Sequence, residues 1–383
     1  MNEASEAQSA RFRCAGCILF WWGELMRIGV DGRKIPEAAE RGPVDSLDHG
    51  KSFGMSGLFY RTVLDMSPTL DRGELRAIRQ RADELGMYVE AGLGKVNPYA
   101  TPETPELRLI GAGDIVRGFR RMMEACVDIG CTELWIGTAN YKSVFAGKWA
   151  YDRFRTDVTW PEQLRATQAF LLKLAPIARD LGVRMNMETH EEITTFEVLG
   201  LIEAVGEEVM GVVLDTLNPM QRGEHPVWAA KRVAPYVRQT HIKDAYVAYM
   251  PDGITIQSRA CGEGAVDFRE VLKILAAHNP TLNLSLECAG PREADFVPRH
   301  TLIEVFQPEW LASHPDLGIE EYAAFLELVQ NYSARIASGE VATWDQYVTA
   351  PFGYDESIAA IKKSAAHLRS VCAELNLPLE AAP

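Results

Sequence analysis

The sequence lacks any apolar run long enough to cross a bilayer. A membrane-spanning helix needs about 20 consecutive apolar residues, whereas the run Cys17–Trp22 is short and is followed by Gly23 and Glu24. The N-terminus also has no basic region followed by an apolar stretch and a small-residue cleavage site, the features of a secretory signal. We therefore expect a cytoplasmic protein with no membrane contact.

Positive charge is scarce. The 383 residues include 39 Lys and Arg against 53 Asp and Glu, which gives a formal net charge of −14. No run of Lys or Arg suggests the basic groove that usually binds phosphate backbones. This charge balance argues against a nucleic-acid partner and favours a small-molecule substrate.

Cysteine is also sparse, and its pattern is weak. Seven cysteines, an odd number, are spread thinly over the chain, which argues against a disulfide framework. Cys14 and Cys17 form a CxxC pair, but no second pair accompanies it. We interpret these two residues as ordinary strand packing.

Apolar strand-like segments alternate with amphipathic helical segments along most of the chain. Strict alternation indicates parallel strands with right-handed crossovers, and eight such units close into a (β/α)8 TIM barrel. An open doubly wound sheet also alternates, but no Gly-rich phosphate-binding fingerprint follows the first predicted strand. The predicted strands are Phe12–Phe20, Leu58–Met66, Tyr88–Gly94, Glu133–Thr138, Arg184–Glu188, Met210–Leu214, Val237–Ile242 and Leu282–Glu287.

A long segment separates the last predicted strand from the last helix. We expect one TIM-barrel domain over residues 1–383, an insertion at 288–354 on the catalytic face, and the last helix and tail at 355–383. Within the insertion, apolar side chains at helical spacing predict a helix at Ile319–Ile336. Its aromatic residues should be buried against the barrel or another subunit. They are Phe296, Phe306, Trp310, Tyr322, Phe325, Tyr332, Trp344 and Tyr347.

Four acidic or imidazole side chains fall at the ends of four predicted strands. They are Glu188, Asp215, His241 and Glu287. The strands of a closed barrel all point their C-terminal ends at one rim, so these side chains should meet. Three converging carboxylates would repel one another unless a cation lay between them. The set therefore predicts a divalent-metal site, with Mn²⁺ favoured and Mg²⁺, Zn²⁺ or Co²⁺ possible.

Four segments carry a resemblance to a known family: METHEE, LDTLNP, THIKDA and LSLECAG. They resemble the sugar isomerase/epimerase-type, xylose isomerase-like TIM barrels over roughly residues 10–290 and the last helix. The resemblance implies that the four matching side chains bind the metal and that the two glutamates, Glu188 and Glu287, also move protons. It implies a ketone or polyol substrate without fixing the reaction.

Further candidates for the site follow from position. His190 lies two residues after Glu188, so the strand period places both on one side, and we include it as a catalytic acid or base. Lys243 either holds a substrate oxygen, balances the carboxylates or forms a structural ion pair. Asn218, Trp22 and Arg292 complete the substrate-binding candidates, Asn218 because it follows Asp215 closely and Trp22 because aromatic faces suit sugars.

The string HEEITTFE, the Arg222–Glu224 loop, the Lys243–Asp244 pair and the long insertion together look similar to the α subunits of bacterial C-glycoside deglycosidases. That resemblance implies a carbon–carbon lyase that cleaves 3-oxo-C-glucosides, accompanied by a smaller β subunit in a hetero-oligomer. A keto-sugar epimerase, isomerase or dehydratase of the same superfamily is the main alternative. A nuclease of the endonuclease IV type would need more metal ligands and a less acidic chain. A non-catalytic sugar-binding subunit should lack a complete ligand set.

Overall fold

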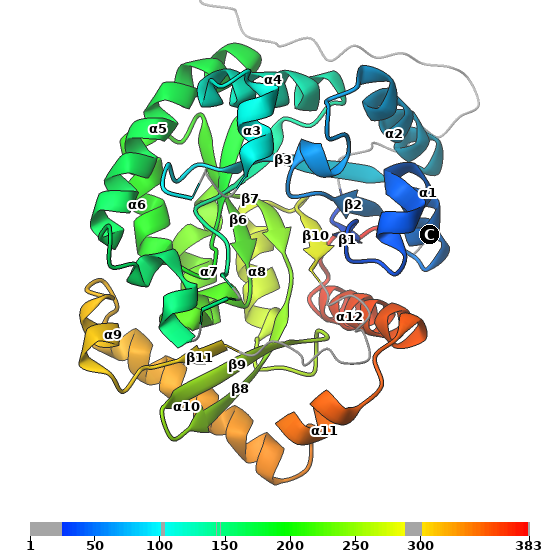
Figure 1. The fold of residues 1–383 in the computed structure, drawn as a ribbon. Helices are drawn as coiled ribbons and strands as arrows, with labels where there is room; N and C mark the ends of the chain where they lie inside the picture. Colours follow the sequence, from blue (N-terminus) through cyan, green and yellow to red (C-terminus); the bar gives the residue numbers. More distant parts are fainter. Residues whose placement is uncertain (1–24, 101–103, 143, 146, 288–300, 382–383) are drawn as a thin grey trace, which may run out of the picture.

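The computed structural model describes residues 25–100, 104–142, 144–145, 147–287 and 301–381 (Figure 1). Within these residues, eight parallel strands lie in the order β10-β1-β2-β3-β4-β5-β6-β7. A parallel bridge between Ile242 and Leu286 joins the two ends of this order, so the predicted barrel is confirmed. The strands are β1 Arg27–Asp31, β2 Gly57–Phe59, β3 Tyr88–Lys95, β4 Glu133–Gly137, β5 Arg184–Glu188, β6 Met210–Asp215, β7 Val237–His241 and β10 Asn283–Leu286.

The first barrel strand is not where the sequence analysis expected it. The segment Phe12–Phe20 lies outside the described residues, and Arg27–Asp31 takes the first-strand position between β2 and β10. The sequence analysis missed this strand because it is short and has a charged residue at each end. Gly29 has no room for a side chain, since an added Cβ would lie 2.5 Å from the Gly57 carbonyl oxygen of the neighbouring strand.

Helices surround the barrel (Figure 1). Their ends follow local capping rules: the Thr194 hydroxyl accepts from the Glu197 amide while the Glu197 carboxylate accepts from the Thr194 amide. Gly86 and Gly182 end their helices in the left-handed conformation. The barrel helices are α1 Ala38–Ser52, α2 Arg72–Leu85, α3 Pro105–Ile110, α4 Ile115–Asp128, α5 Trp160–Leu181, α6 Thr195–Val205, α7 Pro226–Val233, α8 Phe268–His278 and α12 Tyr354–Glu374. Short 3-10 turns are η1 Val63–Asp65, η3 Gly147–Ala150, η4 Asp152–Phe154, η5 Asn218–Arg222 and η6 Ala234–Tyr236. Across the described ranges, no helix is both long and apolar enough to cross a membrane.

A second, antiparallel sheet was not predicted. It contains β8 Asp244–Met250, β9 Gly253–Arg259 and β11 Thr301–Ile303. Strands β8 and β9 form a hairpin directly after the seventh barrel strand, and β11 pairs with β9. Segments that lie before and after the last barrel strand in sequence therefore share one small sheet, a long-range pairing that local patterns do not reveal.

The segment after β11 packs on this sheet. It contains α9 Pro308–Ala312, α10 Ile319–Ala337 and α11 Trp344–Thr349, so the predicted helix at Ile319–Ile336 is confirmed. The Tyr249 hydroxyl donates to the Leu326 carbonyl of α10 at 3.0 Å, and the Tyr332 hydroxyl donates to the Glu263 carbonyl at 2.8 Å. Of the expected buried aromatics, Trp310, Phe325 and Tyr332 are buried, whereas Phe306 is 55% exposed; Phe296 lies outside the described residues.

Phe325→Ala should destabilise the isolated chain by about 3–5 kcal/mol, because it removes a fully buried ring and leaves a cavity. Phe306→Ala is the matched control and should change stability by less than about 0.5 kcal/mol. Urea denaturation of both variants measures the difference. Equal midpoints for Phe325→Ala and the wild type would mean that α10 does not pack on the second sheet in the isolated chain.

Candidate active site

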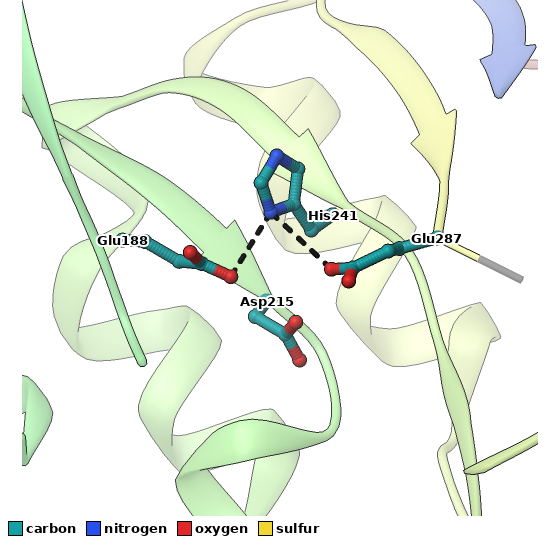
Figure 2. A group of neighbouring side chains, drawn as sticks. All are labelled: Glu188, Asp215, His241 and Glu287. Carbon is teal, nitrogen blue, oxygen red and sulfur yellow. Dashed lines mark hydrogen bonds and ion pairs between the residues drawn. The ribbon is translucent and has the colours of Figure 1, made fainter. Parts of the chain in front are cut away.

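The four predicted side chains meet at the C-terminal rim of the barrel (Figure 2). Glu188, Asp215 and His241 are the last residues of β5, β6 and β7, and Glu287 directly follows β10. Each offers a ligand atom within 4.8 Å of the others. All four are at most 3% exposed. The parallel register explains the convergence, since Asp215 lies directly opposite His241 on the neighbouring strand.

Neighbouring groups hold these side chains in place. His241 Nδ1 points at the carboxylates, 3.0 Å from Glu188 Oε1 and 3.5 Å from Glu287 Oε2 (Figure 2). The indole of Trp135 donates to Glu188 Oε2 at 2.7 Å. The ring of Phe59 stacks on the imidazole of His241, with 4.3 Å between centroids. The geometry is therefore set by elements outside the group itself, as a preorganised site requires.

Asp215 is oriented by the turn that follows it. Its Oδ1 atom accepts from the backbone amides of Leu217 and Asn218, both at 2.8 Å. The Asn218 side chain accepts from Gln221 at 3.4 Å. Asn218 therefore positions Asp215 through its backbone, while its amide side chain stays within its own turn.

The remaining oxygens of the group fit a cation. Asp215 Oδ2 and Glu287 Oε2 are buried and accept no hydrogen bond of regular geometry within the described ranges. The ammonium of Lys243 lies between them, at 2.7 Å from Asp215 Oδ2 and 3.1 Å from Glu287 Oε2. Its positive charge reduces the repulsion between the two carboxylates. Three carboxylates and one imidazole are a ligand set that suits a hard or borderline divalent ion. These residues fit a divalent metal.

Glu287 is surrounded by positive charge. Besides Lys243, the Lys34 ammonium and the Arg61 guanidinium contact Glu287 Oε1 at 2.6 Å and 2.5 Å. Burial alone would raise the pKa of Glu287, but the three cations outweigh it and hold the pKa well below its usual range. Sequence reasoning missed Lys34 and Arg61, because nothing in their local sequence marks them as neighbours of a residue more than 200 positions away.

His190 forms a dyad with Glu192. Its Nδ1 atom lies 2.6 Å from Glu192 Oε2, and Glu192 also accepts a hydrogen bond from the Thr138 hydroxyl. Burial lowers the pKa of His190, but the charge and hydrogen bond of Glu192 outweigh burial and raise this pKa to about 9. His190 is therefore an imidazolium at neutral pH. Its charge interacts with that of Glu188, which places a charged imidazole close to the four-residue group.

Two of the predicted substrate-binding residues, Trp22 and Arg292, lie outside the described residues. A cavity of about 710 Å³ opens at the opposite end of the barrel. It is lined by the first residues of several strands, including Arg27, Tyr88, Glu133 and Asn283. The chemistry of such barrels sits at the C-terminal ends of the strands, so this cavity lies away from the candidate active site.

Residues 47–327 match the family described as xylose isomerase-like TIM barrel. The match covers more than half of the chain, and the chain therefore belongs to this family. The resemblance that the motifs suggested is thus confirmed. The protein is of the class of sugar isomerase- and epimerase-type barrel enzymes.

Individual relatives are more distant. The uncharacterized protein YihM of Escherichia coli K12 is 31% identical over 94 residues, which are 24% of this chain and 29% of that protein. The 3-oxo-isoapionate decarboxylase of Pectobacterium atrosepticum is 24% identical over 237 residues, 61% of this chain and 72% of that enzyme. The crystal structure of the 3-keto-D-glucoside 4-epimerase YcjR of Escherichia coli has a TM-score of 0.51 at 15% identity and covers 75% of this chain and 98% of its own. This structural likeness concerns the fold.

Proposed function

We propose that this protein is a divalent-metal-dependent lyase that breaks a carbon–carbon bond near the ketone of a 3-oxo sugar. The particular reaction we propose is cleavage of the C–C glycosidic bond of a 3-oxo-C-glucoside, as in the α subunits of C-glycoside deglycosidases. The observation that carries the proposal is the juxtaposition of the four-residue group with the His190–Glu192 dyad. The sequence relation to a 3-oxo-isoapionate decarboxylase, by name an enzyme acting on a 3-oxo compound, supports this reaction class.

The chemistry needs an electrophile, a base and an acid. A divalent ion held by the four side chains would polarise the ketone oxygen and stabilise the enolate charge. We assign Glu188 as the carboxylate that takes the proton from the carbon between the ketone and the anomeric carbon. The electrons of that C–H bond form the enolate. When the ketone is restored, a double bond forms between that carbon and the anomeric carbon, and the bond to the aglycone breaks. His190 then donates its proton to the departing carbon, so charge and protons balance.

A keto-sugar epimerase is the second candidate, and the structural neighbour named above is a keto-glucoside epimerase. An epimerase returns a proton to the opposite face and so needs a second base, which in this group would be Glu287. The contacts of Glu287 with Lys34, Arg61 and Lys243 make it a poor proton acceptor. Nearby positive charge lowers the pKa of Glu188 as well, so the lyase proposal rests on the His190–Glu192 dyad and the relation to the decarboxylase, and the products separate it from the epimerase.

The two candidates differ in their products. The metal-loaded protein should release the free aglycone from a 3-oxo-C-glucoside, detected by chromatography. An epimerase would instead exchange one substrate proton for deuterium in heavy water and leave the aglycone attached. Exchange with epimer formation and no aglycone would replace the lyase assignment by the epimerase.

The four-residue group also argues against a nuclease. In the part of the chain that the structure describes, one cluster of potential metal ligands is present, whereas endonuclease IV-type enzymes hold several ions. The net charge of −14 also opposes binding to a phosphate backbone.

Chelation should abolish activity and lower the melting temperature, and Mn²⁺ should restore both. An ion at about 100 times its dissociation constant stabilises the folded state by about 2.7 kcal/mol. Scanning calorimetry before and after treatment with EDTA measures this effect, and the same series with Mg²⁺, Zn²⁺ and Co²⁺ identifies the preferred ion. A melting temperature that neither EDTA nor the added ion changes would contradict the metal site.

We further propose a smaller partner chain, as in the deglycosidases. Exposed aromatic side chains on neighbouring segments offer a docking surface: Phe145 is 53%, Trp149 is 51% and Phe306 is 55% exposed. Gly147, between the first two, lies beside the Glu304 carboxylate. Co-purification of tagged protein from its source cells should recover this partner, and recovery of the chain alone would remove it from the proposal.

A further inference from the structure

One buried arginine joins the segment after β11 to the loop that carries the His190–Glu192 dyad. Arg153 belongs to η4 and is 4% exposed. Its guanidinium donates to the Ser313 carbonyl, which lies between α9 and α10, and to the Glu192 carbonyl at 3.1 Å. Ser313 and Glu192 are far apart in sequence, so this side chain connects the insertion directly to the backbone of the dyad.

The same guanidinium also holds the start of α6. It forms an ion pair with the Glu197 carboxylate at 2.9 Å, and this carboxylate caps α6 by accepting from the Thr194 amide. The Trp160 indole donates to Glu197 Oε1 at 2.9 Å. Residues 189–194, here called the dyad loop, connect β5 to α6. Arg153 therefore holds the dyad loop both near its middle and at its end.

The position of the Glu192 backbone matters because both carboxylate oxygens are engaged. Oε1 accepts from the Thr138 hydroxyl, and Oε2 lies 2.6 Å from His190 Nδ1. Hydrogen bonds weaken steeply away from good geometry, so a rotation of the Glu192 backbone would shift the imidazole relative to Glu188. A catalytic group must be held to within about 0.5 Å. The hydrogen bond from Arg153 to the Glu192 carbonyl opposes such a rotation.

The insertion also contacts the turn that follows Asp215. Arg222, the last residue of η5, donates to His314 Nε2 at 3.3 Å. His314 Nδ1 lies 2.7 Å from the Trp310 carbonyl. A carbonyl oxygen only accepts, so Nδ1 carries the proton and Nε2 is left as an acceptor. Burial, together with the charges of Arg222 and Arg153, lowers the pKa of His314 to about 2, so the ring is neutral.

We propose that Ser313 and His314 form a clamp on one side of the active site and that Arg153 is a positioning residue for the His190–Glu192 dyad. The inference rests on the proposed function, because it takes His190 as the acid of that reaction. The clamp contacts the dyad loop and η5, which follow the neighbouring strands β5 and β6. It gives the insertion a part in catalysis without contact between these residues and the substrate.

Hydrogen exchange followed by mass spectrometry tests the clamp without a substrate. In Arg153→Met, the amides of the dyad loop should exchange at least about 10-fold faster than in the wild type, because the loop loses a charge-assisted hydrogen bond and opens locally. Exchange in the barrel strands should be unchanged. Arg184→Met is the matched control. Arg184 begins β5, at the opposite end from Glu188, and pairs with Glu133 at 2.7 Å, so its loss should leave the dyad loop protected.

Turnover of the metal-loaded protein tests the role in catalysis. Arg153→Met should release the aglycone about 10²-fold more slowly, since a displacement of about 1 Å can have an effect of this size. Exchange of the substrate proton, which depends on Glu188, should fall much less. His314→Phe keeps an aromatic ring at the position that stacks on Trp310, with 4.1 Å between centroids, but cannot accept from Arg222. It should show the same pattern more weakly.

Other results would contradict particular claims. Unchanged exchange in the dyad loop of Arg153→Met would overturn the clamp. Faster exchange with no loss of turnover, or with an equal loss of both reactions, would overturn the positioning role. A wild-type pattern in His314→Phe would remove His314 from the clamp.

Two further cases remain decisive. If the wild-type protein shows neither reaction, the proposed function fails and the positioning role fails with it, while the hydrogen-exchange measurement still decides whether the clamp exists. If Arg153→Met does not fold, Arg153→Lys keeps the charge but carries its donors on a single nitrogen. It cannot reproduce the contacts of both guanidinium nitrogens, so the same two measurements apply to it.

Discussion

Asp215→Asn should abolish metal binding while the protein still folds. The substitution keeps the shape of the side chain and an oxygen that accepts from the amides of Leu217 and Asn218. It removes the negative charge that the structure places within 4.8 Å of the ligand atoms of Glu188, His241 and Glu287. Loss of a supporting group around a metal typically lowers affinity 10–100-fold, so we expect loss of a direct ligand to lower it by more than about 100-fold, and activity with it.

The measurement is metal content by mass spectrometry after dialysis, together with turnover at saturating Mn²⁺. Asp267→Asn is the matched control: Asp267 is an exposed residue that caps α8 through the amides of Arg269 and Glu270, and asparagine caps equally well. The control should retain metal and activity. If Asp215→Asn retained a full complement of metal, Asp215 would not be a ligand and the interpretation of the four-residue group would be wrong.

His190→Gln should lower turnover by about 10²–10⁴-fold, the range typical of a lost general acid or base. Metal content should stay near that of the wild type, because His190 is outside the four-residue group. The mechanism predicts a specific pattern: formation of the enolate, followed as proton exchange, should survive better than release of the aglycone. Glutamine cannot donate an acidic proton to the departing carbon, although it fills a similar volume.

Two further variants separate this role from a structural one. Glu192→Gln leaves the imidazole in place but removes the carboxylate that keeps it protonated, so the pH above which turnover falls should move to lower values. His225→Gln tests loss of an unrelated histidine, one that caps α7 by accepting from the Val227 amide, and turnover should be unchanged. If His190→Gln worked at the wild-type rate, His190 would be a rim residue without a catalytic role. If it lost the metal, His190 would belong to the ligand set.

Much of the fold and of the candidate site was predictable from local sequence patterns. Strand-and-helix alternation is a property of hydrophobic period, so seven of the barrel strands and the helix at Ile319 were predictable from the chain. The four strand-end residues were predictable as a group, because a closed parallel barrel brings all C-terminal strand ends to one rim whatever their distance in sequence. The first strand was missed because its five residues, with a charged residue at each end, show only a weak hydrophobic alternation. The more apolar run nearby was predicted as the strand instead.

The tertiary structure alone decided which other side chains reach the site. Lys34 and Arg61 lie on loops after β1 and β2, and only barrel closure between β1 and β10 brings them to Glu287. The pairing of β11 with β9 likewise joins segments on either side of the last barrel strand. Charge contacts and strand pairing over such separations depend on chain closure, and no local pattern encodes them. The sequence thus determined the barrel and its acidic centre, and the fold decided which cationic side chains surround Glu287.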